Sequence, residues 1–312
     1  KDFTLHRLNN YTPIIFKNPE KFKILQQIQT PHKKSIYRIL LIDDKYFATA
    51  SEDSSIIIWD AVNYTLVKTL QGHSERIWAL IKLGTDFIAS GSSDQKIKIW
   101  DYKNFTTSKV LSGHSAFVTS LLEIKSNILV SGSHDKTIKF WDYKNSKMYK
   151  NYKNDGQGKI MTMIMLSGEE LAVGSDSNIN IINIADGKIS TKLAGHTGLV
   201  KDLLLLDDLQ TLLSAGDDFT IRMWNVFTGT CKQVFKGHSS SCNKILVYNP
   251  SIFITASDDS TIRFWSFETG NTIFTLSEHE SWVISLAITR DGQLLSVGAD
   301  KKIHIWGEEV NN

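Results

Sequence analysis

The chain has 312 residues, of which 35 are Lys or Arg and 33 are Asp or Glu. This near balance gives no net field that would favour nucleic acid or an anionic membrane as a partner. Two cysteines, Cys231 and Cys242, are too few for a disulfide framework, which is typical of a reducing compartment. No apolar run approaches the ~20 residues of a membrane span, and the N-terminus lacks the apolar stretch of a signal peptide. We therefore expect a cytoplasmic or nuclear protein, and the start at Lys1 suggests part of a longer chain.

Tryptophan recurs at a constant interval along the sequence. Successive members stand 41 residues apart, except for one gap of 83 residues, in the middle of which Ile182 takes the expected place. A period of about 40 residues is typical of solenoids, propellers and arrays. Seven units account for nearly the whole chain, which predicts one closed domain rather than two ordinary ones. The six members are Trp59, Trp100, Trp141, Trp224, Trp265 and Trp306.

Three other residue types keep a fixed distance from these tryptophans. An aspartate stands six residues before, at Asp53, Asp94, Asp135, Asp176, Asp218, Asp259 and Asp300. A hydroxyl residue stands ten before, at Thr49, Ser90, Ser131, Ser214, Thr255 and Ser296. A histidine stands 27 or 28 before, at His32, His73, His114, His196, His238 and His279. The fourth unit keeps its aspartate but has Ala172 at the hydroxyl position and no histidine.

Short β-branched runs lie between these markers. Ser55–Trp59, Lys96–Trp100 and Phe87–Ser90 are each predicted as strands. Asp186-Gly187, together with Thr228-Gly229 and its equivalent Thr269-Gly270, predicts hairpin turns just after the tryptophan position. Each unit therefore contains about four strands, and no stretch has a helical period.

The order of His, turn Asp and Trp at these distances resembles the WD40 repeat family over residues 22–307. The resemblance implies an all-β fold, a seven-bladed β-propeller of four-stranded antiparallel blades around a central channel. Residues 1–21 would be an N-terminal extension and residues 308–312 a C-terminal tail. In this family each repeat begins with the outer strand of the preceding blade. The chain ends soon after Trp306, so Phe22–Gln29 should complete the last blade beside it and close the ring.

The recurring Ser, His and Asp could be mistaken for a hydrolase triad. An active site occurs once, whereas this set occurs six times at fixed spacing, so we expect no enzyme activity. The family implies instead a hydrogen-bonded network in each blade, from His to Asp and Ser and from Ser to Trp. The fourth blade, with Asp176 alone, should be looser. No cofactor motif is present, and histidines spread over six blades cannot share one metal ion.

The resemblance also indicates where a partner would bind. In this family the positions three and five residues after the histidine, and the one before the turn Asp, open on the top face. Trp78 and Trp282, the two tryptophans outside the structural position, both fall there. We expect them to form an aromatic sector with neighbouring rings, although these rings could instead pack between blades. The predicted partner-binding residues are Trp78, Tyr37, Phe117, Trp282, Arg76, Lys201, His134, Glu52, Asp217 and Asp258.

Two readings of function remain open at this point. The first is a non-enzymatic protein-interaction scaffold that binds a peptide or protein on the top face, within a larger complex. The alternative is a substrate-receptor or targeting domain of a larger enzyme, such as a ubiquitin ligase or kinase. The segment from Lys144 to Lys159 holds five lysines and one acid, Asp155. A lipid or nucleic-acid patch there is weaker than the view that lysines protect an edge strand.

Overall fold

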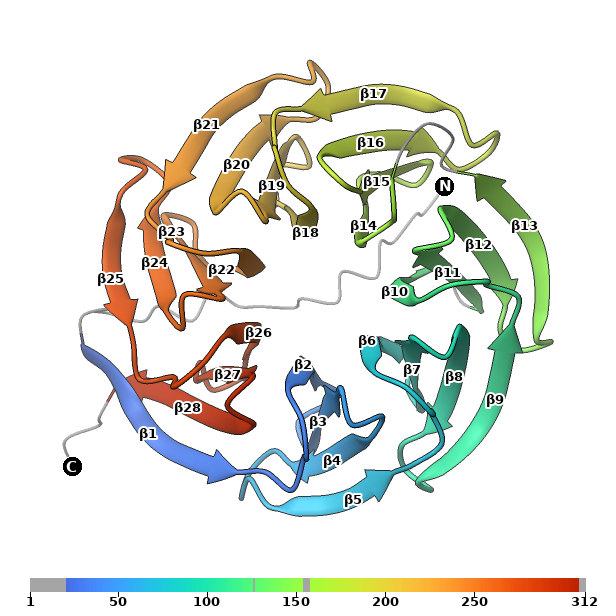
Figure 1. Ribbon diagram of the computed structural model, residues 1–312, viewed down its shortest axis with the longest axis horizontal. Coiled ribbons are helices and arrows are strands. Elements are labelled where there is room, and N and C mark those ends of the chain that lie inside the picture. Colours follow the sequence, from blue (N-terminus) through green and yellow to red (C-terminus); the bar gives the residue numbers. More distant parts are fainter. Residues whose placement is uncertain (1–20, 126, 154–157, 309–312) are drawn as a thin grey trace.

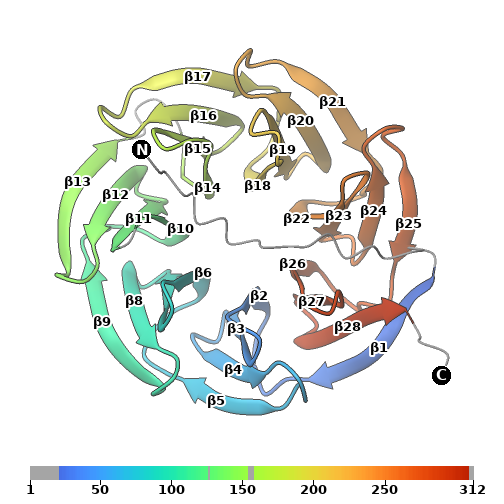
Figure 2. The same cartoon turned by 180° about the vertical axis from the view of Figure 1, so that it is seen from behind.

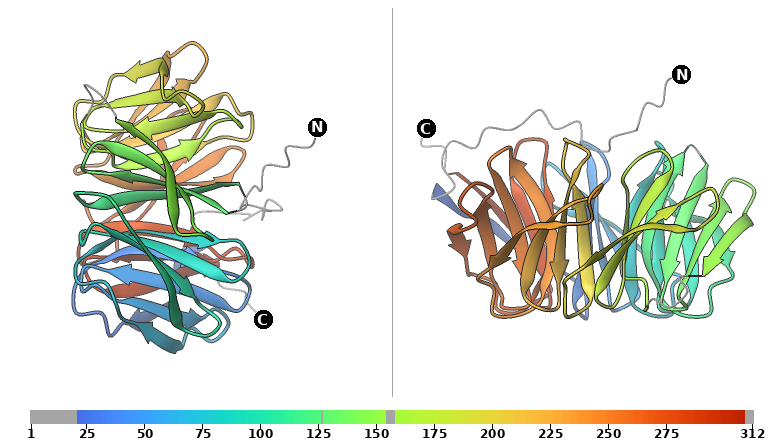
Figure 3. Two further views of the ribbon diagram at one scale, coloured as in Figure 1. Left: turned by 90° about the vertical axis from the view of Figure 1, so that its right-hand side faces the viewer. Right: turned by 90° about the horizontal axis from the view of Figure 1, so that it is seen from above.

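A computed structural model describes residues 21–125, 127–153 and 158–308 of the chain. Their 28 strands form seven four-stranded antiparallel sheets, arranged as blades around a central axis (Figure 1). Seen from the side, the blades form a disc (Figure 3). Among these residues no helix is long and apolar enough to cross a membrane. The predicted seven-bladed propeller is confirmed, while the predicted extension and tail lie almost wholly outside the described residues.

The strands follow one another from the axis outward in six of the seven blades. Blades one to three contain β2 (Ile36–Leu41), β3 (Tyr46–Ser51), β4 (Ile56–Asp60), β5 (Leu66–Leu70), β6 (Ile77–Leu83), β7 (Phe87–Ser92), β8 (Lys96–Asp101), β9 (Thr106–Ser112), β10 (Val118–Lys125), β11 (Ile128–Ser133), β12 (Thr137–Asp142) and β13 (Lys147–Lys153). Blades four to six contain β14 (Thr162–Met165), β15 (Glu170–Gly174), β16 (Asn178–Asn183), β17 (Ile189–Ala194), β18 (Val200–Leu205), β19 (Thr211–Gly216), β20 (Thr220–Asn225), β21 (Cys231–Lys236), β22 (Cys242–Asn249), β23 (Ile252–Ser257), β24 (Ile262–Ser266) and β25 (Thr272–Leu276).

The seventh blade joins the two ends of the described chain. Its order is β26 (Val283–Ile288), β27 (Leu294–Gly298), β28 (Lys302–Glu308) and then β1 (Phe22–Gln29). Strand β1 pairs antiparallel with β28, placing Ile24 opposite Trp306. In Figures 1 and 2 the first strand lies beside the last at the outer edge of this blade. The predicted closure by residues 22–29 is therefore confirmed.

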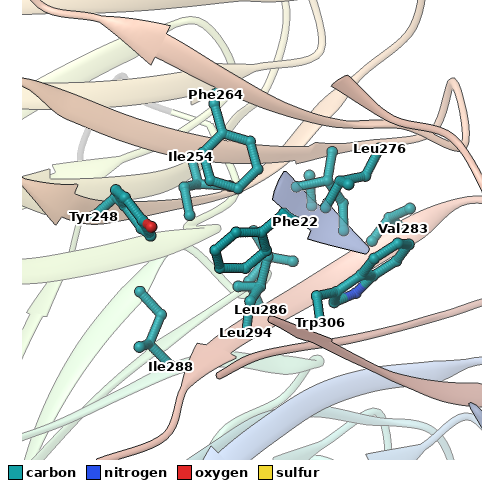
Figure 4. Close-up of a cluster of buried hydrophobic side chains, with 12 residues drawn as sticks. Phe22, Tyr248, Ile254, Phe264, Leu276, Val283, Leu286, Ile288, Leu294 and Trp306 are labelled. Atoms are coloured by element: carbon teal, nitrogen blue, oxygen red, sulfur yellow. The ribbon is translucent and has the colours of Figure 1, made fainter. Parts of the chain in front are cut away.

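Phe22 extends this closure into the core between blades six and seven. Its ring is 4% exposed and lies 5.6 Å from that of Phe264 and 5.9 Å from that of Tyr248. Figure 4 shows the ring surrounded by side chains of both blades, including Leu286 and Trp306. A buried Phe stabilises a fold by roughly 1.5–3 kcal/mol through the hydrophobic effect. The first strand thus contributes packing as well as backbone hydrogen bonds.

The predicted hydrogen-bonded network is present in six blades, and blade two illustrates it. His73 contacts the Asp94 carboxylate through Nδ1 and the Ser90 hydroxyl through Nε2, both at 2.7 Å. The Trp100 indole donates to the same hydroxyl at 2.8 Å. The side chains are buried, where paired polar groups rigidify a structure and unpaired ones destabilise it. We call each such set of His, Asp, Ser or Thr, and Trp a tetrad.

The innermost strands of six blades share a further feature. In β2 the pairing with β3 skips one residue, Tyr37, between Ile36 and Arg38. A β-bulge of this kind re-aims a side chain. The same skip occurs in the innermost strands of all blades but the fourth, where β14 pairs with β15 without interruption. The bulge residues are Tyr37, Trp78, Thr119, Lys201, Asn243 and Ile284.

Candidate functional site on the top face

We call the top face the side of the disc that holds the turns with the tetrad aspartates. The residue before each of these turn aspartates hydrogen-bonds the loop that enters the innermost strand. Asp217 N, for example, donates to Leu199 O at 2.8 Å, and Ala299 N donates to Trp282 O at 2.9 Å. Bulge residues and turn residues of neighbouring blades are thereby brought to one end of the central channel.

An aromatic cluster spans blades one to three on this face. The rings of Tyr37 and Trp78 meet edge to face, with centroids 4.9 Å apart. Phe117 stacks on the other side of Trp78 at 6.4 Å, and His134 lies 5.2 Å from Phe117. The Trp78 indole also donates a hydrogen bond of 2.7 Å to Ser93. These contacts hold the Trp78 ring in one orientation on a partly exposed surface.

Arg76 is part of the same cluster. Its guanidinium lies 4.8 Å from the Tyr37 ring centre and 4.9 Å from that of Trp78, positions that give cation–π attraction. It also forms an ion pair of 2.6 Å with Glu52. The charge of Arg76 is therefore already balanced, and the group contributes chiefly a flat stacking surface.

The opposite side of the ring carries charged groups that pair with one another. The Lys201 ammonium lies 2.7 Å from Asp217 and 3.5 Å from Asp258. Asn243 donates to Asp258 at 2.7 Å and to the Val283 carbonyl at 2.8 Å. One cation is thus shared by two carboxylates in a network that crosses blades five, six and seven.

Between the two sides lies a pocket of about 460 Å³ at the mouth of the channel. This volume is within the range typical of ligand sites. Of the ten residues predicted from sequence, seven line the pocket: Tyr37, Trp78, His134, Lys201, Asp217, Asp258 and Trp282. The other three, Glu52, Arg76 and Phe117, lie outside the lining but in contact with Trp78 or Arg76.

Trp282 does not pack between blades. Half of its side-chain surface is exposed, at 50%, and Phe117 is exposed to 41%. Large contiguous apolar patches are uncommon on the surface of monomeric proteins and mark interaction sites. Trp78 is instead half-buried between Tyr37 and Phe117, so it combines structural contacts with an accessible edge.

Six residues of the pocket lining were not among the predicted site residues, and Asp176 is the acidic one among them: Lys159, Met161, Asp176, Leu199, Asn243 and Ile284. Asp176 of blade four lines the pocket, whereas none of the other six turn aspartates does. The sequence placed it with the tetrad residues because its spacing is the same. The absence of a histidine partner in this blade is the signal that could have identified it.

A second cluster of titratable groups lies in blade seven. His279, Asp300 and His304 bring their side chains within 4.8 Å of one another. Both nitrogens of His279 already bond within its tetrad, to Asp300 and Ser296. Its ring stacks on that of His304 at 3.9 Å with an angle of only 14°. Parallel rings cannot both direct a lone pair at one ion, so this cluster does not suit metal binding.

The lysine-rich segment lies on an outer edge as far as Lys153, as expected for the protective role, whereas Lys159 lines the central pocket. Strand β13 is the outermost strand of blade three, and Lys147 and Lys153 are exposed on it. Lys150 donates instead to the carbonyls of Ile184 and Ala185 in blade four, at 2.8 and 3.1 Å. Residues 154–157 of the segment lie outside the described residues.

Comparison with known protein families agrees with this geometry. The model described as "WD domain, G-beta repeat" matches residues 24–60, 64–101, 105–142, 187–225, 229–266 and 270–307, most of the chain. The chain is a member of the WD40 repeat family. This WD40 propeller departs from the family model between residues 143 and 186, the part that includes Asp176 and lacks the other tetrad residues.

Individual relatives resemble only part of this WD40 propeller. It is 34% identical over 82 residues to "F-box/WD repeat-containing protein 10" of Mus musculus, which is 26% of this chain and 8% of that protein. It is 35% identical over 82 residues to "Apoptotic protease-activating factor 1" of Danio rerio, with coverages of 26% and 6%. "Polycomb group protein FIE1" of Zea mays is 36% identical over 77 residues, with coverages of 24% and 17%. The matched region is thus a small part of much longer relatives.

Proposed function

We propose that this propeller is a non-enzymatic interaction domain that holds a segment of a partner protein across the channel mouth on its top face. The observation that carries the proposal is the Trp78 cluster with exposed Phe117 and Trp282 beside a pocket of about 460 Å³. Aromatic side chains near the centre of an interface contribute most of its binding energy. The names of the relatives point to different roles, although the relatives match the same kind of repeat. The fold alone therefore does not select a partner, and we assign that selection to these side chains.

The repeated Ser, His and Asp sets support a structural rather than a catalytic role. The Ser90 hydroxyl is completely buried and already bonds both His73 and Trp100. A nucleophilic serine must be reached by its substrate and activated by a nearby base. In this arrangement the hydroxyl is enclosed and its hydrogen-bonding capacity is used within the blade.

The test is a double substitution, Trp78→Ala with Phe117→Ala, in the full chain. Proteins that co-purify with the wild type should be lost, since truncation of a central aromatic anchor weakens binding by about 2 kcal/mol or more, roughly thirtyfold. The matched control is Phe227→Ala. This aromatic residue is 69% exposed, lies in the hairpin between β20 and β21, and is not part of the pocket lining. An unchanged circular dichroism spectrum and a cooperative unfolding transition show that the fold is retained. Partners kept at full yield would move the interface to another face.

A second candidate is a substrate-receptor or targeting domain of a larger enzyme. Two observations favour it: an F-box stands beside the repeats in the names of several relatives, and the matched repeats occupy under a tenth of the mouse protein. The same top face would then bind the substrate. Mass spectrometry of the complex isolated through this propeller decides between the two, because only a receptor domain brings ubiquitin-ligase or kinase subunits in fixed proportion.

A further inference from the structure

Blade four differs from the other six in what surrounds its turn aspartate. In blade three, for example, Asp135 accepts a hydrogen bond of 2.7 Å from His114 and is nearly buried. In blade four Ala172 and Ile182 occupy the positions of the tetrad Ser and Trp. Asp176 is exposed and forms no hydrogen bond or ion pair with any residue that the structure describes. The loss of the tetrad has therefore freed a carboxylate that is structural elsewhere.

The freed carboxylate turns to the central pocket. Asp176 belongs to the pocket lining together with Lys159, which precedes the inner strand of the same blade. Its carboxylate lies directly over the Cα of Gly158, where a Cβ would overlap it. A glycine at this position leaves the space that the side chain uses. The missing tetrad partners and the glycine at position 158 thus both leave the Asp176 carboxylate free to take this position.

The charges around the pocket leave an excess of negative charge. Its lining contains three carboxylates, Asp176, Asp217 and Asp258, and two ammonium groups, Lys159 and Lys201. Lys201 is occupied by the two aspartates of blades five and six. Burial lowers the pKa of His134, and Lys159 lowers it further, so the imidazole adds no positive charge at neutral pH.

The walls of the pocket complement this charge. Trp282 of blade seven lies across the ring from Asp176 of blade four, and Trp78 and Tyr37 extend the aromatic wall. Lys and Arg side chains lay their carbon stems along apolar surface while the charged end seeks a polar partner. Aromatic faces attract cations as well. A single side chain of this kind uses both halves of the pocket.

We propose that the partner segment inserts a Lys or Arg side chain into this pocket, with its cation at Asp176 and its stem along the aromatic wall. The inference rests on the proposed top-face function and names the chemistry that the face selects. Blade four thereby contributes to the choice of partner, because its turn aspartate contacts the ligand instead of the other residues of a tetrad.

The test uses a random heptapeptide display library selected on the purified, immobilised chain. Selected peptides should be enriched in Lys or Arg, and Trp78→Ala should abolish their binding. Asp176→Asn should weaken the binding of a synthetic peptide from the selected set by at least about tenfold, as expected when a charged partner is removed. Asp186→Asn is the matched control, an exposed aspartate of blade four at the hairpin that follows β16, and it should leave the affinity unchanged.

Stability measurements separate ligand contact from a structural role. Asp176→Asn should keep the wild-type melting temperature, whereas Asp135→Asn should lower it because the latter breaks a tetrad. Gly158→Ala should lower the affinity for the peptide without any change of charge, because the added methyl group displaces the Asp176 carboxylate. Asp176→Lys should in turn prefer the peptide in which the basic residue is replaced by Glu.

The outcomes distinguish the two proposals. If no peptide is selected, or if the selected peptides bind Trp78→Ala as well as the wild type, the proposed top-face function fails and this inference fails with it. If peptides depend on Trp78 but show no preference for Lys or Arg, only the inference is overturned. The same holds if the preference persists in Asp176→Asn, or if that variant loses stability as Asp135→Asn does.

Discussion

The indole of Trp78 meets the ring of Tyr37 edge to face, with the centroids 4.9 Å and the planes 68° apart. The two residues are 41 positions apart in sequence and occupy the same bulge in neighbouring blades. The contact therefore links blade one to blade two at the point where we propose that a partner binds.

A double-mutant cycle should measure this contact. We expect Tyr37→Ala and Trp78→Ala to be coupled by about 0.5–1.5 kcal/mol in urea unfolding, the range for aromatic pairs. The control cycle pairs Trp78→Ala with Phe227→Ala, which belongs to blade five, and its coupling should be near zero. Equal coupling in both cycles would show that the Tyr37 contact has no specific energetic role.

Removal of the closing strand should destabilise the whole ring. A chain that begins at Thr30 lacks β1, so β28 presents an unpaired edge and the cluster around Phe22 loses its central ring. Exposed edges pair with other chains. We expect a lower melting temperature and aggregation in size-exclusion chromatography, with a chain beginning at Lys21 as the control. A monomer with an unchanged melting temperature would contradict the closure.

Loss of one tetrad histidine should lower stability but not binding. His114→Ala leaves Asp135 and Ser131 without the imidazole that they share, and a buried polar group without its partner costs about 1–3 kcal/mol. Urea unfolding gives the loss of free energy, and the co-purification assay gives the binding. A variant of normal stability that has lost a chemical activity would instead point to catalysis by these residues.

Stability should also fall when the pH is lowered, because of His304. Burial lowers the pKa of this imidazole to about 4, and the charge of His279 adds to the effect. The unfolded chain binds the proton near pH 6.5 while the folded chain resists it, so stability is lost progressively as pH falls from 6.5 to 4. The loss is on the order of 3 kcal/mol.

The variant His304→Ile isolates this contribution, because Ile57 is buried at the same position of blade one. Urea unfolding between pH 7 and 4 should show a shallower decline in the variant than in the wild type. Parallel declines would assign the effect to other groups. The tetrad aspartates lose their stabilising contribution at lower pH, since burial of Asp135 would raise its pKa but hydrogen bonds from His114 and Thr137 hold it below the usual range.

The repeat itself could be deduced from the sequence because each blade uses the same local chemistry. The spacing of His, Asp, Ser and Trp reflects contacts within one blade, as in His73, Asp94, Ser90 and Trp100. Closure by Phe22–Gln29 could be predicted by counting strands. The predicted hairpin turns are present, and Gly187, Gly229 and Gly270 adopt positive φ in them.

The tertiary structure decided how residues of different blades meet. Repeat alignment placed both Trp282 and Trp78 on the top face, yet the first is 50% exposed and the second is held between Tyr37 and Phe117. It also grouped Asp176 with the tetrad aspartates, although only this one lines the pocket. Fixed spacing encodes neighbours within a blade, whereas exposure and charge pairing depend on side chains that the ring brings together from blades far apart in sequence.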